Sequence, residues 1–458
     1  MLALRIRDFR LLWTGELLSS LGSWLLLVAV PYQVFELTGS ALATGITFIA
    51  ESLPALVIGP VAGVAADRWD RRRIMLAVSL GQAGCILPVA FVHRPGQVTI
   101  IYAALMAESV LGQLYAPAAR ALVPSLVGRN EELTSANALS SASNAMTRLA
   151  GAALGGILLA ALGLAAVVLI DVGSYLAAAG CIGLLRWRAA PRGEAECARE
   201  RGAARTAAAE LRAGVRHLAV SRPLRGLLLA AAMFQLGNGA FTAALVPYIH
   251  LRLHGTAADV GFLIAATGAG FLIGAPLSRR LFHRVRLRML ASLALLITAA
   301  AYAGWFSTSH LAAALPLAAL TGMTAMIFLV TRLTWLQRLT PGRLLGRASS
   351  AFAAAEGGAG LIGITLGGIL IGLAGLAATV AAAGLAIAGG GVLAAVLLRG
   401  PPPPEPGETA GRRLLAGAAV DELAGDVELA DVPGILLQEV EQDAAERRPG
   451  AGRGEPPA

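Results

Sequence analysis

Seven ionisable side chains interrupt stretches of the sequence that are otherwise almost purely apolar. They are Glu16, Glu51, Glu108, Arg148, Asp171, Arg332 and Glu356. A charged group at the centre of a membrane-spanning helix costs about 2.5–3.5 kcal/mol on insertion scales, so each of these residues is a functional candidate by default. Burial favours the neutral form of a carboxyl group, which lets such a group bind and release protons near neutral pH. The residues therefore indicate proton binding and ion pairing inside a membrane.

Glu108 is the first candidate for a carboxylate that carries protons, because it lies near the middle of its apolar stretch and far from any loop. Glu16, Glu51 and Glu356 are the further candidates for proton coupling. Glu16 is equally well explained as an interfacial residue, and Glu51 lies in the outer half of its stretch, where it can face the mouth of a cavity. For Asp171, near the outer end of its stretch, we expect a structural hydrogen bond.

Arg148 lies far from both ends of its apolar stretch, so its charge does not reach water. It needs either a carboxylate partner, for which Glu16 and Glu356 are the candidates, or an anionic group on a substrate. Asn144, one turn earlier, lies on the same helix face and is able to share that contact. Arg332 lies near the inner end of its stretch, where we expect the side chain to extend to the membrane interface.

The composition is that of a membrane protein. Hydrophobic residues make up 56% of the 458 residues and charged residues only 14%, whereas soluble domains usually carry about 25% charged residues. The mean hydropathy is +0.69, and 54 glycines fit helices that approach one another closely in lipid. Three scattered cysteines do not make a disulfide framework or a metal site. The net charge of +9 comes from arginines outside the apolar stretches, so the bilayer, and no nucleic acid, is the expected partner.

Twelve apolar stretches are long enough to span a bilayer, which takes about 20 residues. They lie near 11–35, 41–66, 74–93, 98–119, 136–162, 165–186, 224–248, 257–278, 287–307, 311–337, 347–372 and 375–398. Alternate connections carry nearly all of the arginines, including ten between 186 and 225, whereas the opposite connections carry only Arg94 and Arg252. By the positive-inside rule, the arginine-rich side and both termini are predicted to be cytoplasmic. The sequence thus predicts an all-α, multi-pass protein of the inner or plasma membrane.

The two sets of six stretches resemble each other. VPY at 30–32 recurs at 246–248, Leu21-Gly22 as Leu236-Gly237, LGGIL at 154–158 at 366–370, and Gly59/Gly63 as Gly270/Gly274, with offsets of 216, 215, 212 and 211 residues. Parallel six-helix repeats place a substrate site near the middle of the bilayer, between the halves. We therefore predict an N-terminal half (1–186), an arginine-rich cytoplasmic linker (187–222), a C-terminal half (223–399) and a proline-rich, acidic tail (400–458) that is expected to be disordered.

Several classes of protein are excluded. The sequence contains no lysine, so it has no G-x-x-x-x-G-K-[ST] loop and no P-loop ATPase of its own. The six histidines form no H-E-x-x-H or comparable spacing, so neither a catalytic nor a metal-binding set of residues is predicted.

The densest cluster of charge is ADRWDRRR at 66–73, in a short gap between two apolar stretches. Gly59 and Gly63 give the preceding helix a smooth face that a neighbour can approach. Asp67 lies at the end of this helix, where it can pair with an arginine or cap a neighbouring helix. Such a contact can form in one conformation and break in another, so we interpret the cluster as a latch. The alternative is that its arginines only fix the orientation of the chain.

This cluster resembles the signature that the major facilitator superfamily has between its second and third helices. The matching residues are Gly63, Asp67, Arg68, Arg71 and Arg72. Asp70 stands where the signature usually has glycine, and the equivalent loop of the second half has Ser278 in place of the acid. Together with VPYQVFELTGSA, YAPAARALVPSLV and LQRLTPGRLLGRASSAF, the resemblance extends over residues 5–399 and points to the branch of enterobactin and macrolide exporters.

The segment SANALSSASNAMTRLAGAALGGIL is similar to the antiporter motif of proton-driven exporters. Its matching residues are Gly151, Gly155 and Gly156, with Ala152 where that motif has proline and with Asn144 and Arg148 one or two turns before. The glycines alone indicate that another backbone packs closely there. The resemblance also implies a central cavity lined by the first, fourth, seventh and tenth helices. Candidates for contacts with an amphipathic ligand are Tyr32, Gln33, Tyr115, Gln235, Asn238 and Trp335, although ordinary helix packing is the favoured explanation for each one taken singly.

The leading hypothesis is a secondary transporter of the major facilitator fold, not an enzyme. It would export a drug, siderophore or secondary metabolite of amphipathic character by proton antiport and alternating access. The proton gradient would be its energy source, without a cofactor, and the resemblance favours a monomeric transport unit. The alternatives are a proton-coupled importer of a small solute, or a membrane sensor that does not transport.

Overall fold

The computed structural model describes residues 3–68, 70–128, 131–186, 216, 218–282 and 284–398, without the side chains of 59–69 and 342–343. The predicted linker lies mostly, and the predicted tail wholly, outside the described residues. Residues 1–400 form one compact unit. Below, the N-terminal half means residues 1–186 and the C-terminal half residues 223–399, as the sequence predicts them.

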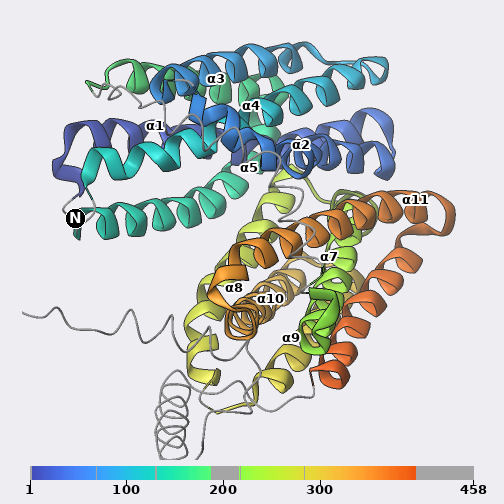
Figure 1. Ribbon diagram of the computed structural model, residues 1–458. Helices are drawn as coiled ribbons and strands as arrows, with labels where there is room; N and C mark the ends of the chain where they lie inside the picture. The colour runs from blue at the N-terminus through green and yellow to red at the C-terminus, as the bar shows by residue number, and fades with distance from the viewer. Residues whose placement is uncertain are drawn as a thin grey trace, which may run out of the picture. The chain divides into compact units, whose positions relative to one another are not determined.

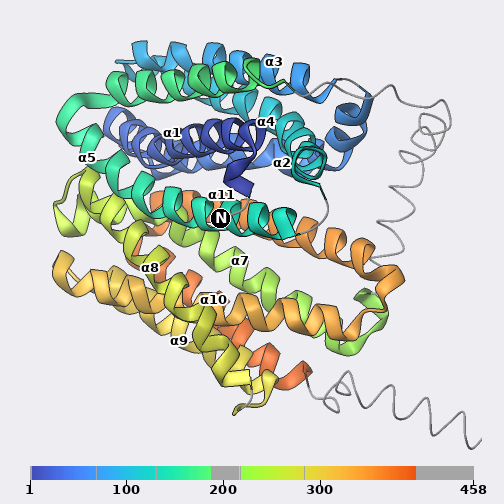
Figure 2. The ribbon, with the colours of Figure 1, turned by 90° about the vertical axis from the view of Figure 1, so that its left-hand side faces the viewer.

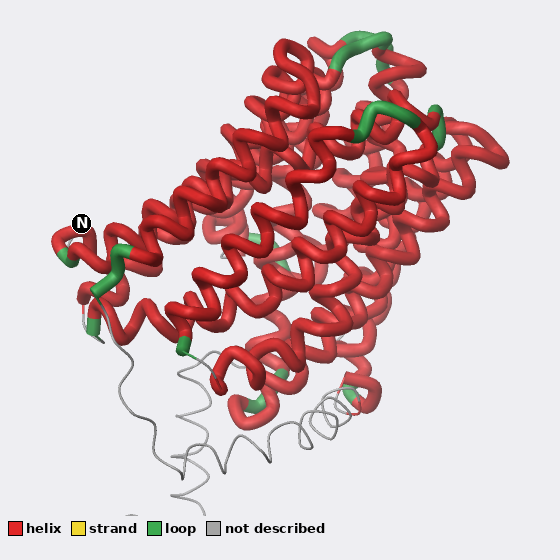
Figure 3. Tube along the Cα trace, turned by 90° about the horizontal axis from the view of Figure 1, so that it is seen from above, coloured by secondary structure: helices red, strands yellow, loops and turns green. Residues whose placement is uncertain are grey.

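The described residues are helical apart from short connections (Figure 3). The helices are η1 (Ala3–Arg5), α1 (Arg7–Thr38), α2 (Ala41–Arg68), α3 (Arg71–Ile86), η2 (Leu87–Phe91), η3 (Pro95–Gln97), α4 (Val98–Val127), α5 (Glu131–Gly183), α7 (Arg222–Tyr248), η4 (Ile249–Leu253), α8 (Ala257–Phe282), α9 (Leu287–Ser307), α10 (Leu311–Leu339) and α11 (Gly342–Leu397). Helices satisfy their backbone hydrogen bonds internally, which is what a chain in lipid requires.

Two glycines divide the longest helices, so the part of the chain that the structure describes contains the twelve predicted segments. Among the described residues, ten helical stretches are long and apolar enough to cross a membrane. Two of these stretches contain α5 and α11, which leave helical geometry at Gly163 (φ 78°, ψ 171°) and Gly375 (φ 83°, ψ 172°). A positive φ of this kind is accessible to glycine and strained for other residues. We call the segments before and after each glycine the first and second arms of that helix.

Many large apolar side chains point outward, as a lipid environment allows. Leu373, Leu385 and Phe91 are 81%, 72% and 70% exposed. In a water-soluble protein, such a surface would mark an interaction site or an aggregation hazard. The exposed side chains and the apolar helices together make this a multi-pass membrane protein, and the predicted fold class is confirmed.

Close helix contacts repeat between the halves. Within the N-terminal half, Gly155 lies against α1, where an added Cβ would be 2.6 Å from the carbonyl oxygen of Leu25. Within the C-terminal half, Gly367 lies against α7 in the same way, with an added Cβ 2.7 Å from the Cα of Ala240. The kinks at Gly163 and Gly375 are likewise separated by the offset of the LGGIL repeat. The sequence repeat therefore has a structural counterpart.

The halves meet along two equivalent pairs of helices, α5 with α8 and α11 with α2 (Figures 1 and 2). A Cβ added at Gly156 would lie 2.9 Å from the Cα of Ala258 and closer still to the carbonyl oxygen of Ala257. One added at Gly368 would lie 2.9 Å from the Cα of Leu42. Both contacts lie towards the ends of the helices that carry few arginines, which we call the arginine-poor side. The opposite side is the arginine-rich side.

Candidate functional site

Glu51 and Glu108 line the same cavity of about 330 Å³ in the N-terminal half, which we call the carboxylate cavity. Glu51 comes from α2 and Glu108 from α4. The remaining lining residues are Ser19, Ser23, Gln82, Ser109, Gly112, Gln113, Tyr115 and Tyr175. The sequence places Glu51 in the outer half of its stretch and does not predict its neighbour, whereas in the structure Glu51 lines the same cavity as Glu108.

Hydrogen bonds fix the Glu108 carboxylate and the backbone of Glu51 at this cavity. The hydroxyl of Tyr175, on the second arm of α5, donates to Oε1 of Glu108. The same hydroxyl lies 3.1 Å from Oγ of Ser23 on α1. Ser109 of α4 donates to the backbone oxygen of Glu51 at 2.5 Å, which ties α2 to α4. Two carboxylates in one cavity repel each other when both are ionised, so the arrangement is suited to binding and releasing a proton.

Asp171 lies on the same arm of α5 as Tyr175, one helical turn before it, and is completely buried. Ser174 donates to its Oδ1 at 3.3 Å, which is the kind of structural hydrogen bond that the sequence predicts. Its Oδ2 has no hydrogen-bond partner among the described residues. Gly22 of α1 leaves the space that the carboxylate occupies, because a Cβ there would collide with Oδ1.

Glu16, a residue of α1, lies in a different place, where α1 packs against the first arm of α5. It lines a small cavity together with Asn144 and Thr147. Hydrogen bonds from Trp13 Nε1 to Ser143 Oγ (2.9 Å) and between the hydroxyls of Ser20 and Thr147 (3.0 Å) fasten the two helices around it. Glu16 is therefore a separate carboxylate site rather than a member of the carboxylate cavity.

Arg332 and Glu356 form an ion pair between α10 and α11, which corrects two predictions. Arg332 does not extend to the interface, and Glu356 does not pair with Arg148. The side chains of Arg332 and Glu356 are only 20% and 11% exposed, and the guanidinium also lies 5.4 Å from the ring centroid of Phe352. Because the two helices pack side by side, each charge finds its opposite locally.

We expect Glu356→Gln to lower the free energy of unfolding by about 3 kcal/mol, because it leaves Arg332 buried without its partner. The double variant Arg332→Leu with Glu356→Leu is expected to recover most of that loss, since it removes both charges. Thermal unfolding of the purified chain in detergent measures the difference, with Arg338→Gln, an exposed arginine on the same helix, as control. Equal destabilisation by the single and the double variant would contradict this explanation.

Arg148 lies between two aromatic rings, one from each half. Its Cζ is 5.3 Å from the ring centroid of Trp24 on α1 and 4.8 Å from that of Phe271 on α8. Its Nε is buried and has no hydrogen-bond partner among the described residues. Among the described residues, no carboxylate forms an ion pair with Arg148.

The predicted polar and aromatic cavity residues do not gather in one site. Tyr115 joins the carboxylate cavity, whereas Asn238 accepts a hydrogen bond from Tyr302 at 2.8 Å inside the C-terminal half. Trp335 is 5% exposed and belongs to the apolar core of that half. Gln33 and Gln235 are half-buried.

Tyr32 lies at the arginine-poor side, where it contacts a histidine across the two halves. The ring centroids of Tyr32 and His250 are 5.0 Å apart, as are those of Phe35 and His250. Nε2 of His250 lies 2.5 Å from Oε1 of Glu36. Glu36 lies in the last turn of α1 and His250 follows α7, so this contact joins the halves beside the Gly156 and Gly368 contacts.

The predicted latch is described only in part, since the side chains of Gly63, Asp67 and Arg68 lie outside the described ones. Nη1 of Arg71 donates to the carbonyl of Ala121 in α4 at 3.0 Å. Asp70, in the unusual position, caps α3 by accepting from the backbone N–H of Arg73 at 3.0 Å. It therefore has a local structural role.

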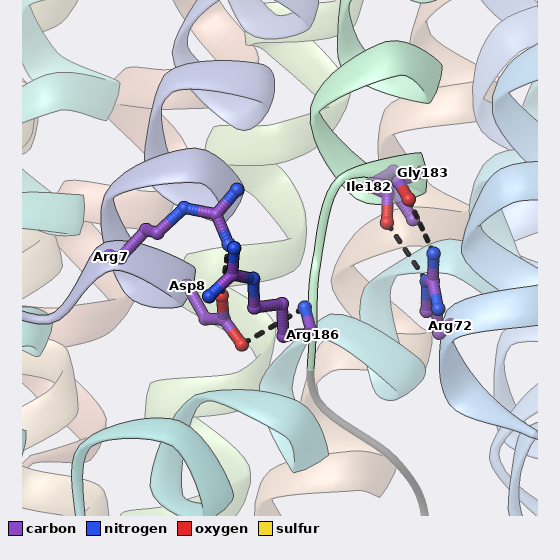
Figure 4. Close-up of polar contacts among 6 residues, drawn as sticks. All are labelled: Arg7, Asp8, Arg72, Ile182, Gly183 and Arg186. Carbon is purple, nitrogen blue, oxygen red and sulfur yellow. Dashed lines mark hydrogen bonds and ion pairs between the residues drawn. The ribbon is translucent and has the colours of Figure 1, made fainter.

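Arg72 caps the second arm of α5 (Figure 4). Its Nε donates to the carbonyl of Ile182 at 3.1 Å and its Nη2 to that of Gly183. A cation at a helix C-terminus satisfies carbonyls that lack intrahelical partners. Nearby, Asp8 of α1 accepts from the backbone N–H of Arg186 at 3.2 Å. On the arginine-rich side, Arg71 and Arg72 thus bind other helices of their own half.

Sequence reasoning missed the partners of the charged residues rather than the residues themselves. Among these partners, only Tyr175 has a position in the sequence that could have indicated its role. It follows Asp171 by one helical turn, on the same helix face. Trp24, Phe271 and Glu36 give no signal in the sequence, because apolar rings within membrane helices and carboxylates near helix ends are common.

Comparisons with known proteins agree with this architecture. The chain matches the family described as "Transmembrane secretion effector" over residues 1–404. It is 30% identical over 274 residues to the MFS-type transporter YfiS of Bacillus subtilis, covering 59% of this chain and 63% of that protein. It is 28% identical to macrolide efflux protein A of Streptococcus pyogenes over 39% of this chain and 44% of that protein. The matches thus span less than two thirds of both relatives.

A longer match links the chain to the enterobactin exporter EntS of Escherichia coli, with 27% identity over 80% of this chain and 84% of that protein. Among solved structures, a bacterial homologue of the iron transporter ferroportin in an inward-facing state has a TM-score of 0.69 at 18% identity, covering 87% of this chain and 99% of that one. A bacterial Spinster homologue has a TM-score of 0.62 at 16% identity, covering 85% and 94%. At such low sequence identity, these two structures support a similarity of fold and nothing further. The chain therefore belongs to the transmembrane secretion effector family of the major facilitator superfamily, whose members are transporters and not enzymes.

Proposed function

We propose that this protein exports an amphipathic small molecule in exchange for protons, with Glu108 as the principal proton-carrying carboxylate and Glu51 beside it. The observation that carries the proposal is the carboxylate cavity, where both groups meet inside membrane-spanning helices. Carboxylates inside a membrane are rare and mark proton pathways. The names of the macrolide and enterobactin relatives support export of molecules that combine apolar and polar parts.

The contacts between the halves support alternating access as the mechanism. Gly156, Gly368 and the Glu36–His250 pair join the halves on the arginine-poor side. In the proposed cycle, these contacts separate when the substrate leaves and a proton enters, and they re-form when the proton is released on the other side. The positive-inside rule supports a cytoplasmic arginine-rich side in the cell membrane. We further propose a monomeric transport unit that uses the proton gradient and no cofactor.

The test is transport by the purified full chain in liposomes, with and without an imposed proton gradient. Two amphipathic dyes serve as probes. Rhodamine 123 is a lipophilic cation, and dansylglycine carries a carboxylate on an aromatic body. Gradient-dependent movement of either dye, together with proton flux in the opposite direction when that dye is added, is the expected result. Movement of a dye in the same direction as protons would contradict antiport and favour proton-coupled import. Transport of neither dye under any gradient would overturn the proposal.

A further inference from the structure

Arg148 is a half-buried arginine in a membrane-spanning helix, and no described carboxylate forms an ion pair with it. The other buried arginine, Arg332, has Glu356 as its ion-pair partner. Arg148 instead contacts two aromatic rings, and its buried Nε has no hydrogen-bond partner in the described part of the chain. A guanidinium in a membrane-spanning helix is expensive to leave without a carboxylate or an anionic ligand.

The two rings do not provide hydrogen-bond acceptors for the N–H groups of Arg148. Trp24 and Phe271 contact the guanidinium through its Cζ, at 5.3 Å and 4.8 Å from their centroids. These contacts stabilise the positive charge but provide no hydrogen-bond acceptor in the plane of the guanidinium. The side chain is only half-buried, and its two Nη groups are not among the buried atoms without partners. Their N–H groups are therefore available to a planar anion, which a guanidinium binds through two parallel hydrogen bonds.

The surroundings favour an organic anion over a small inorganic one. An indole and a phenyl ring flank the charge, and such rings offer apolar surface to the body of a ligand whose head binds the guanidinium. Trp24 belongs to the N-terminal half and Phe271 to the C-terminal half, so a ligand at Arg148 contacts both halves. A site of this kind changes when the halves move, which alternating access requires.

We propose that Arg148 is the anion-binding residue of the substrate site, and that the transported molecule is an amphipathic organic anion with a carboxylate or sulfonate group. The inference rests on the proposed transport function and names its substrate class. Trp24 and Phe271 hold the guanidinium between them and cover the apolar part of the ligand. Asn144 lies one helical turn before Arg148, on the same face of the helix.

The test compares an acid with its methyl ester, because the ester keeps the apolar body of the ligand, adds one methyl group and lacks the negative charge. Dansylglycine and its methyl ester are titrated onto the purified full chain in lipid nanodiscs, and binding is measured by dansyl fluorescence. A second anion, 8-anilinonaphthalene-1-sulfonate, probes the sulfonate class. We expect wild type to bind dansylglycine about tenfold more tightly than the ester, as a charge-assisted bidentate contact implies. Arg148→Gln should abolish that preference and Arg148→Lys should retain part of it.

Arg252→Gln is the matched control, because it removes one exposed positive charge outside the site and should leave the preference unchanged. Equal binding of acid and ester by wild type, an unchanged preference in Arg148→Gln, or binding of neither anion would each overturn the assignment. The same preparations are tested for transport of rhodamine 123 and dansylglycine. If anion binding depends on Arg148 but neither dye is transported, the proposed transport function fails while the anion site stands.

Discussion

Replacing Glu108 with glutamine is expected to lower gradient-driven transport by about tenfold or more, since the variant removes the carboxylate best placed to carry protons. Glutamine keeps the size of the side chain and can still accept the hydrogen bond from Tyr175 through its amide oxygen. The helix contacts should therefore survive while proton binding is lost. Transport is measured in liposomes with the dye that wild type moves, at equal amounts of reconstituted protein.

Two comparisons make the Glu108 prediction specific. Glu131→Gln removes an exposed carboxylate at the start of α5 and should leave transport at the wild-type rate. Glu51→Gln removes the second carboxylate of the cavity and should reduce transport less, because Glu108 can still bind a proton. The decisive secondary measurement is exchange of dye between equal concentrations without a gradient. Exchange should persist in Glu108→Gln, since substrate movement does not itself require the proton, and a loss of both activities would point to a structural role.

The apolar pattern was sufficient to predict the membrane-spanning helices. Stretches of about 20 apolar residues predict spanning helices because lipid leaves no other way to satisfy the backbone. Even the reversals of direction were predicted closely: the predicted gaps at 163–164 and 373–374 lie at, or one residue before, the kinks at Gly163 and Gly375. Glycine marks both points because they require a positive φ. The two-half organisation with its boundaries, and the orientation, stay predictions.

The partners of the charged residues were not predictable from the sequence, for a physical reason. Insertion energies identify Arg148, Arg332 and Glu356 as expensive in a membrane, but they say nothing about which neighbouring helix compensates each charge. That depends on the rotation of each helix about its own axis and on which helices lie side by side. Arg332 and Glu356 meet because α10 and α11 bring them together, whereas Arg148 faces two rings. Nothing in the spacing of these residues distinguishes the two outcomes.

Replacing Gly156 with alanine is expected to weaken closure of the arginine-poor side. The added methyl group would lie 2.9 Å from the Cα of Ala258 and nearer still to the carbonyl oxygen of Ala257. These neighbours are backbone atoms, which cannot turn aside as a side chain does. Overpacking of this kind typically costs about 1–3 kcal/mol, and a bias of that size changes the ratio of two conformations by roughly 5- to 150-fold. Transport, which needs both conformations, should fall accordingly.

The control for Gly156 is Gly173→Ala, because nothing lies within 4 Å of a Cβ added at that position of the second arm of α5. Both variants exchange a helical glycine for a better helix former, so only the interhelical clash separates them.

Spin labels at Leu162 and Leu251, each 59% exposed and one in each half, report the distance between the halves in a variant without native cysteines. Gly156→Ala should shift this distance distribution to longer values, and Gly368→Ala should do the same from the equivalent α11–α2 contact, while Gly173→Ala matches wild type. If Gly156→Ala lowers transport without moving the labels apart, the glycine acts within the N-terminal half, and closure between α5 and α8 is not the step it controls.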